Sequence, residues 1–308
     1  MVGTVTLSME VELAWGSHDK PGADDHLSPD RSAETATLRR LLARCADCEV
    51  PFTFSVVGHL FESNCRGHGE TPHPTGWFDA DPGTDVETDP LFYAPDLIDE
   101  IRTSPVDHEF ATHTYSHVLC DEIDDDVLRW ELDRALDRHA DAGLANPRSF
   151  VAPRHRQVDR ALLSEYGIET IRTPFDGYGA WPGGPPGTAA WILGRRHPTG
   201  TPTEADGVLE TRCTTHPSLT AQHLPQGQRP SHIAFRAIPR RVRERIHARY
   251  LRDATERAVA RDEHVHLWTH LYNLANESQL SVVTDYLEFL ADQRDRGRIT
   301  IATMADLA

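Results

Sequence analysis

The stretch Val5-Thr-Leu-Ser-Met-Glu-Val-Glu-Leu13 alternates apolar and polar side chains without a break. This period of two predicts a β-strand with one apolar and one polar face. Glu10 and Glu12 are two positions apart, so both carboxylates leave the strand on its polar face. Strand and helix patterns then alternate almost to the end of the chain, which predicts a parallel α/β barrel.

The remaining patterns place the other elements of this barrel. Alternating or continuous apolar runs predict strands over residues 51–57, 108–112, 149–153, 169–172, 264–270 and 298–302. Apolar residues at helical spacing predict helices over residues 32–46, 125–142, 158–166, 239–262 and 278–295. Residues 62–96 and 173–237 are rich in Gly and Pro and show no period, so we expect long loops or insertions there. The chain, residues 1–308, is expected to form one domain.

The charge balance restricts the partners of the protein. The 308 residues include 48 Asp and Glu against 31 Lys and Arg, a net charge of −17, and Lys20 is the only lysine. Such an acidic chain is a poor binder of nucleic acid or of anionic membranes. The arginine-rich stretch 236–252 also contains Glu244 and apolar residues, so it predicts an amphipathic helix with a solvated cationic face.

The same composition indicates the solvent and the compartment. Acid excess with almost no lysine is expected of a halophilic protein, because concentrated salt screens charge repulsion; an ordinary acidic enzyme from a GC-rich genome is the alternative. No apolar stretch reaches the roughly 18 residues that a membrane span needs. After Met1 there is no basic start and no apolar run, so a cytoplasmic location is expected.

Two histidine pairs have the i, i+4 spacing that can place imidazoles side by side around a divalent ion. His113 and His117 would do so on a helical turn. With 18 histidines in the chain, this spacing alone is a weak signal. His266 and His270 lie in a strand pattern, where they share a face at a greater separation. We therefore expect no shared metal for this second pair and retain only His270 as a candidate.

The context of the first pair resembles a known family. Glu109-Phe-Ala-Thr-His-Thr-Tyr-Ser-His117 is similar to the metal-binding motif of the NodB-type polysaccharide deacetylases, a group similar to carbohydrate esterase family 4. Ser8-Met-Glu-Val-Glu12, Val151-Ala-Pro-Arg-His155 and Leu267-Trp-Thr-His270 resemble its other motifs in the same order. The resemblance covers nearly the whole chain apart from residues 62–96 and 173–237. Together with the acid excess, it points to a haloarchaeal member.

The resemblance implies a distorted (β/α) barrel, a bound divalent metal, most commonly Zn²⁺, and hydrolysis of N-acetyl groups on a carbohydrate. It implies metal ligands at Glu12, His113 and His117, a catalytic base at Glu10 and a general acid at His270. Val11 falls where the family has its metal-binding aspartate, so the roles of Glu10 and Glu12 can be exchanged. Arg154 would pair with the base carboxylate, and the neighbouring His155 is the alternative for this role.

Three functions stay open at this point. The first is a metal-dependent deacetylase of an intracellular glycan intermediate, and the second is a related C–N hydrolase of a non-sugar amide. The third is an inactive barrel that binds glycans or serves in an assembly. Tyr178, Trp181, Trp191 and Phe235 are either a platform for sugar rings or packing residues of their loop. The oligomeric state is not predicted.

Overall fold

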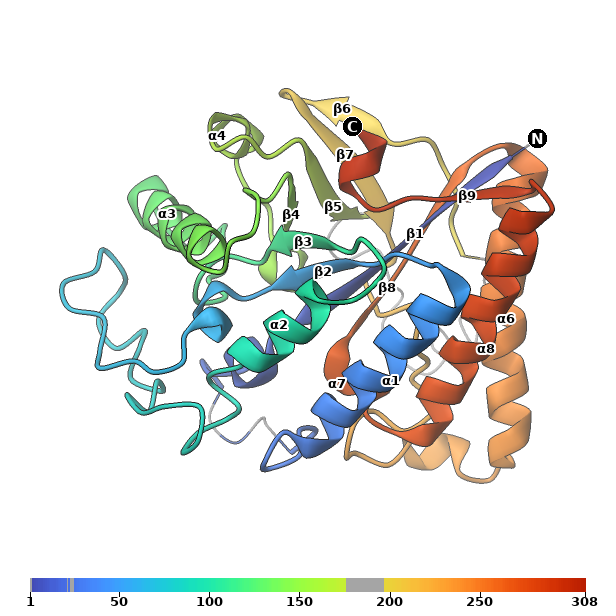
Figure 1. Ribbon diagram of the computed structural model, residues 1–308, viewed down its shortest axis with the longest axis horizontal. Coiled ribbons are helices and arrows are strands. Elements are labelled where there is room, and N and C mark those ends of the chain that lie inside the picture. Colours follow the sequence, from blue (N-terminus) through green and yellow to red (C-terminus); the bar gives the residue numbers. More distant parts are fainter. Residues whose placement is uncertain (1, 21, 23–24, 176–196) are drawn as a thin grey trace.

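A mixed sheet of nine strands forms the centre of the molecule (Figure 1). The computed structural model describes residues 2–20, 22, 25–175 and 197–308. The strand order is β6-β7-β5-β4-β3-β2-β1-β8, and β9 pairs with the first residues of β1. The pairing is parallel throughout except between β6 and β7. The strands are β1 (Gly3–Val11), β2 (Thr53–Val56), β3 (Glu109–Thr112), β4 (Ser149–Val151), β5 (Thr170–Pro174), β6 (Thr203–Ala205), β7 (Val208–Cys213), β8 (His264–His270) and β9 (Ile299–Ile301).

Helices lie around the outside of this sheet, with α6 and α8 side by side (Figure 1). The α-helices are α1 (Ser32–Cys48), α2 (Pro95–Arg102), α3 (Asp125–Asp141), α4 (Arg160–Glu165), α6 (Arg240–Arg261), α7 (Leu271–Leu274) and α8 (Glu277–Asp295). The 3-10 helices are η1 (Leu13–Gly16), η2 (Gly58–Phe61), η3 (Pro153–His155), η4 (Ile233–Phe235) and η5 (Ala305–Leu307). Every strand and helix that the sequence patterns predict is present, with ends that differ by a few residues.

The sheet curls into a distorted barrel that is not closed by a continuous ladder of paired strands. Among the described strands, no ladder joins β7 to β8. Side chains connect these two strands instead, because Thr211 Oγ1 on β7 lies 2.9 Å from His266 Nδ1 on β8. The predicted barrel is therefore correct in its order of strands and helices. Its seam is held by side chains and by isolated backbone hydrogen bonds to β8, such as those between Gly200 and His264 (3.0 Å).

The two segments without periodicity differ from each other. Within residues 62–96 the described structure is irregular until α2 begins at Pro95. Residues 173–237 contain β6, β7 and η4, so the expectation of a loop is wrong for residues 203–213. These strands form the edge of the sheet beyond β5, which no local pattern indicates. Of the four aromatic residues considered for sugar binding, Tyr178, Trp181 and Trp191 lie outside the described residues, and the Phe235 ring packs near His223 and His232.

The alternation in β1 separates two kinds of core. Val5, Leu7, Met9 and Val11 have no exposed surface and belong to the main apolar core. Full burial of such a side chain contributes about 1.5–3 kcal/mol to folding. The opposite face is also buried but polar, and its Ser8 Oγ lies 2.7 Å from His266 Nε2. The barrel interior is therefore a hydrogen-bonded polar network, which leads to the functional groups at its end.

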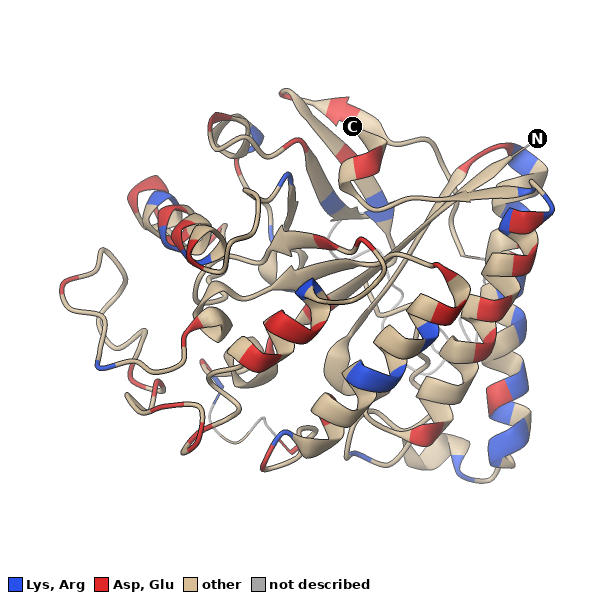
Figure 2. Cartoon of the chain, viewed as in Figure 1, with Lys and Arg blue, Asp and Glu red and all other residues tan. Residues whose placement is uncertain are grey.

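The charged helix α6 carries both signs of charge (Figure 2). Arg240 pairs with Glu244 four residues later, and Arg243 turns inward to donate to Ser231 Oγ (2.8 Å). Part of the arginine run is thus used in packing. In the described parts of the chain, no helix has the length and apolar character that crossing a bilayer requires.

Candidate metal and catalytic site

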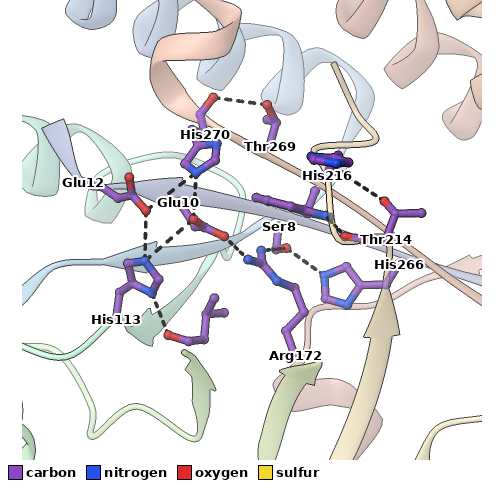
Figure 3. A network of polar contacts seen from close by, with 12 residues as sticks. Ser8, Glu10, Glu12, His113, Arg172, Thr214, His216, His266, Thr269 and His270 are labelled. Atoms are coloured by element: carbon purple, nitrogen blue, oxygen red, sulfur yellow. Dashed lines mark hydrogen bonds and ion pairs between the residues drawn. The ribbon is translucent and has the colours of Figure 1, made fainter. Parts of the chain in front are cut away.

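The carboxyl ends of β1, β3 and β8 bring the predicted site residues together (Figure 3). Glu12 follows β1, His113 follows β3, and His270 is the last residue of β8. Parallel strands present their carboxyl ends at one edge of the sheet, where barrel enzymes build their sites. Residues far apart in the sequence therefore share a single cluster.

Glu12 lies between two imidazole rings. Its Oε1 is 3.1 Å from His113 Nε2 and 3.2 Å from His117 Nε2, and all three side chains are buried. His113 Nδ1–H donates to the carbonyl of Val151 (2.6 Å), which leaves a lone pair on Nε2 of the neutral ring. That lone pair faces a carboxylate oxygen. Two acceptors this close require a cation between them, either a proton or a metal ion.

The turn that carries the two histidines is not helical, contrary to our expectation. Thr114 and His117 have left-handed backbone conformations, with φ of 61° and 63°. Such conformations are uncommon for residues other than glycine and cluster at functional sites. The resulting turn still places the two imidazole rings 5.0 Å apart between centroids.

Glu131 on α3 holds this turn in place. Its Oε2 accepts hydrogen bonds from the backbone N–H groups of Tyr115 (2.8 Å) and Ser116 (2.7 Å). Its Oε1 accepts from the Ser116 hydroxyl, and the carboxylate is completely buried. The sequence pattern gave Glu131 no role, because a glutamate inside an amphipathic helix reads as an ordinary surface residue.

Glu10 occupies a different environment from Glu12. Its Oε1 pairs with the Arg172 guanidinium, and its Oε2 lies 3.0 Å from His270 Nε2 (Figure 3). Arg172 also donates to Ser8 Oγ (3.1 Å) and lies over the Trp268 ring. Val11, between the two glutamates, is buried in the apolar core. It therefore cannot take the place of the family's metal-binding aspartate.

The expected contact between Arg154 and Glu10 is wrong. Arg154 follows β4 in a left-handed turn (φ 51°) and pairs with Asp19, with Nη1 2.8 Å from Oδ2. Arg172 takes the place beside Glu10, because β5 presents it to the barrel interior. The alternative, His155, packs against the Trp268 ring, and neither ring nitrogen has a hydrogen-bond partner among the described residues. The one signal for Arg172 in the sequence is a charged residue inside a short strand.

His270 links the two carboxylates. Its Nε2 is 3.0 Å from Glu10 Oε2 and 3.7 Å from Glu12 Oε1, and its Nδ1–H donates to Asn273 Oδ1 (3.1 Å). The His270 side chain is 16% exposed, against 4% for Glu10 and 6% for Glu12. His270 is therefore the group of this cluster that a substrate reaches first. Asn273, which orients the ring, was not predicted from the sequence.

Burial and the neighbouring charges set the protonation of the cluster. Burial by itself raises the pKa of Glu12, but His270, His117 and His113 together hold it well below its usual value. Burial lowers the pKa of His117 to about 4 and that of Arg172 to about 10. Burial also lowers the pKa of His270, against the opposing effect of Glu12. The low pKa of Glu12 keeps its carboxylate ionised at neutral pH.

The donor set fits a divalent metal ion. Glu12, His113 and His117 each offer one ligand atom, and these atoms lie within 4.8 Å of one another. Two imidazoles and one carboxylate are a common set for catalytic Zn²⁺, which leaves positions open for water and substrate. The hydrogen bond from His113 to a backbone carbonyl is the kind of support that orients metal-binding histidines.

Comparison with known proteins agrees with this architecture. Residues 25–171 match the family model described as polysaccharide deacetylase. This region includes His113 and His117, whereas Glu10, Glu12 and His270 lie outside it. No curated protein sequence matches the chain.

Solved structures share the fold along the whole chain. A protein from Mycobacterium smegmatis, assigned as a polysaccharide deacetylase, has a TM-score of 0.60 at 15% identity, covering 98% of this chain and 87% of its own. A protein from Pseudomonas aeruginosa PAO1, also assigned as a polysaccharide deacetylase, has a TM-score of 0.57 at 11% identity. The match covers 99% of this chain and 89% of that protein. An allantoinase has a TM-score of 0.58 at 11% identity, and the match covers 99% of this chain and 88% of the allantoinase. With its family match over residues 25–171, just under half of the chain, and this shared fold, the chain is similar to polysaccharide deacetylases.

Proposed function

We propose that this protein is a metal-dependent hydrolase that removes N-acetyl groups from a carbohydrate or a glycan precursor. One observation carries the proposal: Glu12 faces two imidazoles, while the second carboxylate, Glu10, lies 3.0 Å from the more exposed His270. A metal site beside a separate base and acid is the set of groups that amide hydrolysis requires. The match of residues 25–171 to the polysaccharide deacetylase family model supports an acetylated sugar as the substrate.

Glu12, His113 and His117 are the proposed metal ligands, with Zn²⁺ as the proposed ion. A divalent ion at such a site lowers the pKa of a water molecule and polarises the acetyl carbonyl. The chain contributes the geometry of the ligands. The Val151 carbonyl orients His113, and Glu131 fixes the turn that carries His117.

Glu10 is the proposed base. Its Oε2 takes the proton of the water whose oxygen attacks the acetyl carbon. The guanidinium of Arg172 favours the carboxylate form of Glu10 and holds Oε1, so that Oε2 stays directed toward His270. Arg172 is itself held by Ser8 and by the Trp268 ring, which leaves it little freedom to move.

His270 is the proposed general acid. A proton that Glu10 has accepted can pass over the 3.0 Å between Oε2 and Nε2. His270 then gives this proton to the nitrogen as the C–N bond breaks, and the products are acetate and the free amine. Because Asn273 accepts from Nδ1–H, the ring keeps Nε2 available for this transfer.

The test is acetate release by the purified protein in concentrated KCl, with N-acetylglucosamine oligomers and nucleotide-linked N-acetyl sugars as substrates. We expect activity with at least one of them, loss of activity on chelation, and recovery with Zn²⁺. A His113→Ala/His117→Ala variant should be inactive, and the exposed His232→Ala variant serves as the control. Metal-free, inactive wild-type protein would overturn the proposal and leave an inactive glycan-binding barrel.

A non-sugar amide is the second enzymatic candidate, and the panel should include allantoin because an allantoinase shares this fold. If the protein hydrolyses allantoin in a metal-dependent way and releases no acetate from any sugar, the proposed roles of the site residues would stand and the proposed substrate class would change. Acetate release from sugars alone would exclude this candidate.

A further inference from the structure

A second cluster of metal-binding residue types lies on the segment that follows β2 and shares no residue with the first. It consists of His59, Cys65, His68 and Asp81, whose ligand atoms all lie within 4.8 Å of one another. We propose that this cluster is a second metal site, which binds Zn²⁺ through four protein ligands and fastens residues 62–96 to the barrel. Two histidines, one cysteine and one carboxylate are donors that zinc accepts in a closed tetrahedral site.

Asp81 is oriented with one oxygen saturated and the other turned into the cluster. Its Oδ1 accepts hydrogen bonds from the Tyr93 hydroxyl (3.0 Å) and the Gly83 N–H (3.1 Å). Its Oδ2 lies 2.6 Å from His68 Nε2 and 3.3 Å from His59 Nε2. The Asp81 side chain is 3% exposed. Partners of this kind on the non-ligating oxygen are what a metal-bound carboxylate has around it.

His59 provides an independent observation. It has no exposed surface, and its Nδ1–H donates to the Phe92 carbonyl (3.3 Å), so the neutral ring has a lone pair on Nε2. Nε2 has no hydrogen-bond partner in the described structure and faces the Asp81 oxygen. A buried nitrogen lone pair directed at a carboxylate is costly unless a cation lies between them.

Cys65 and His68 complete the set and have the C-x₂-H spacing of many zinc sites. Cys65 Sγ is 3.7 Å from His68 Nε2 and accepts a hydrogen bond from the Gly67 N–H (3.4 Å). Phe78 stacks on the His68 ring at 3.8 Å, so its plane is fixed before any ion binds. Metal binding would release the thiol proton of Cys65.

Four protein ligands leave no open position, so the proposed role is structural. Residues 62–96 lack regular structure until α2 begins, and an ion would supply the stability that backbone ladders provide elsewhere. The same segment contacts the turn over residues 113–117 and its support. Trp77 Nε1–H donates to Ser116 Oγ (2.8 Å), and His73 Nε2 lies 2.8 Å from Glu131 Oε1. A metal at the second site would therefore also support the turn that carries His113 and His117.

The experiment uses Co²⁺ as a spectroscopic substitute for Zn²⁺ in the full chain. A thiolate ligand gives Co²⁺ a sulfur-to-metal charge-transfer band in the near ultraviolet, and the first site has no sulfur. We expect this band in the wild type and in His113→Ala/His117→Ala, and its loss in Cys65→Ser and Asp81→Asn. Cys48→Ser, on α1, is the matched control and should keep the band. Metal analysis should show one Zn²⁺ per chain fewer in Cys65→Ser than in Cys48→Ser.

A second measurement needs no variant and therefore does not depend on whether one folds. The folded wild-type protein is alkylated with and without chelator, and modification of Cys65 is read by peptide mass spectrometry. Bound zinc should protect Cys65, and chelation should expose it. The absence of the band together with equal alkylation of Cys65 in both conditions would overturn the second site. Because both readouts follow the thiol, they do not depend on the proposed deacetylase activity.

Discussion

The two histidine clusters of this protein are made of similar residues but are assembled in different ways. In the first, Glu12, His113 and His270 come from the ends of three different strands, so the whole sheet must form before they meet. In the second, His59, Cys65, His68 and Asp81 come from one continuous segment of the chain. The first cluster therefore depends on the fold, whereas the second would help to create the local structure around it.

The difference also separates two kinds of chemistry. The first cluster has three proposed ligands for an ion, and beside them lie a second carboxylate and a partly exposed histidine, as in a catalytic site. The second has four ligands, and its Asp81 and His59 are saturated by Tyr93, Gly83 and Phe92 on their other sides. Open coordination with reactive neighbours indicates catalysis, and closed coordination indicates a structural role.

The largest expected effect is the loss of activity on substitution of Glu10, the proposed base of the first cluster. Glu10→Gln should lower kcat by roughly 10²–10⁴-fold, because general-base catalysis is lost, and should leave both metals in place. Glu12→Gln should instead lower the metal content of the first site. Acetate release and metal analysis of the two variants check this assignment. The reverse pattern, in which Glu10→Gln loses metal, would exchange the two roles.

The next effect compares Arg172, which lies beside Glu10, with Arg154, which the sequence analysis expected there. Arg172→Gln should lower kcat/KM roughly 10–100-fold, because Glu10 loses the partner that orients it. It should also reduce the free energy of unfolding by about 3–5 kcal/mol, since it leaves an unpaired buried carboxylate. Arg154→Gln is the matched control, because Arg154 pairs with Asp19 on a partly exposed loop. Equal losses of activity in both variants would contradict the placement of Arg172.

Local patterns were sufficient for the fold and for bringing Glu10, Glu12, His113 and His270 to one edge of the sheet. Period-two alternation predicted β1 and put Glu10 and Glu12 on one face, and helical spacing predicted α1, α3, α6 and α8. The strand ends then placed His113 and His270 at one edge. These predictions succeed because each depends on neighbours within one element, or on the general geometry of parallel strands.

The parts that sequence reasoning missed depend on contacts between distant segments. Arg172 can be recognised as the partner of Glu10 only once β5 is known to face β1 across the barrel. Glu131 can be recognised as a support only once α3 is known to pack against the turn over residues 113–117. Arg154 was chosen from a motif whose turn, in this chain, directs it toward Asp19. The second cluster had a local signal in the C-x₂-H spacing of Cys65 and His68, but its two other members are set by folding of the loop.

A smaller effect tests whether the position of the Glu12 carboxylate depends on the absence of a side chain at Gly16. A Cβ at Gly16 would collide with Glu12 Oε2, so Gly16→Ala must displace the carboxylate. Because that atom is the end of a flexible side chain, the fold should survive, while activity and Zn²⁺ affinity fall roughly tenfold. Gly200→Ala is the control, since its Cβ would meet only Phe175 at 3.7 Å. Zinc titration and thermal unfolding of both variants measure the effect, and unchanged zinc affinity in Gly16→Ala would contradict it.

The last effect appears only in acid and concerns a histidine that belongs to neither cluster. His139 on α3 is fully buried beside the rings of Phe61 and Phe110, and neither ring nitrogen has a hydrogen-bond partner in the described structure. Burial lowers its pKa to about 4, below the value of about 6.5 in an unfolded chain. Between these values the unfolded state binds more protons, so this contribution to stability is complete above pH 6.5 and is lost as the pH falls toward 4.

His139→Leu removes this proton linkage. Relative to the wild type, its free energy of unfolding should rise by up to about 1.4 kcal/mol for each pH unit of acidification between pH 6.5 and 4. Leu132→Val, in the same helix, should lower stability by about 1 kcal/mol at every pH, because it changes packing without removing a titrating group. Denaturant unfolding at several pH values measures both. Parallel pH profiles for wild type and His139→Leu would show that His139 has the same pKa in the folded and the unfolded protein, and would contradict the effect of burial on this histidine.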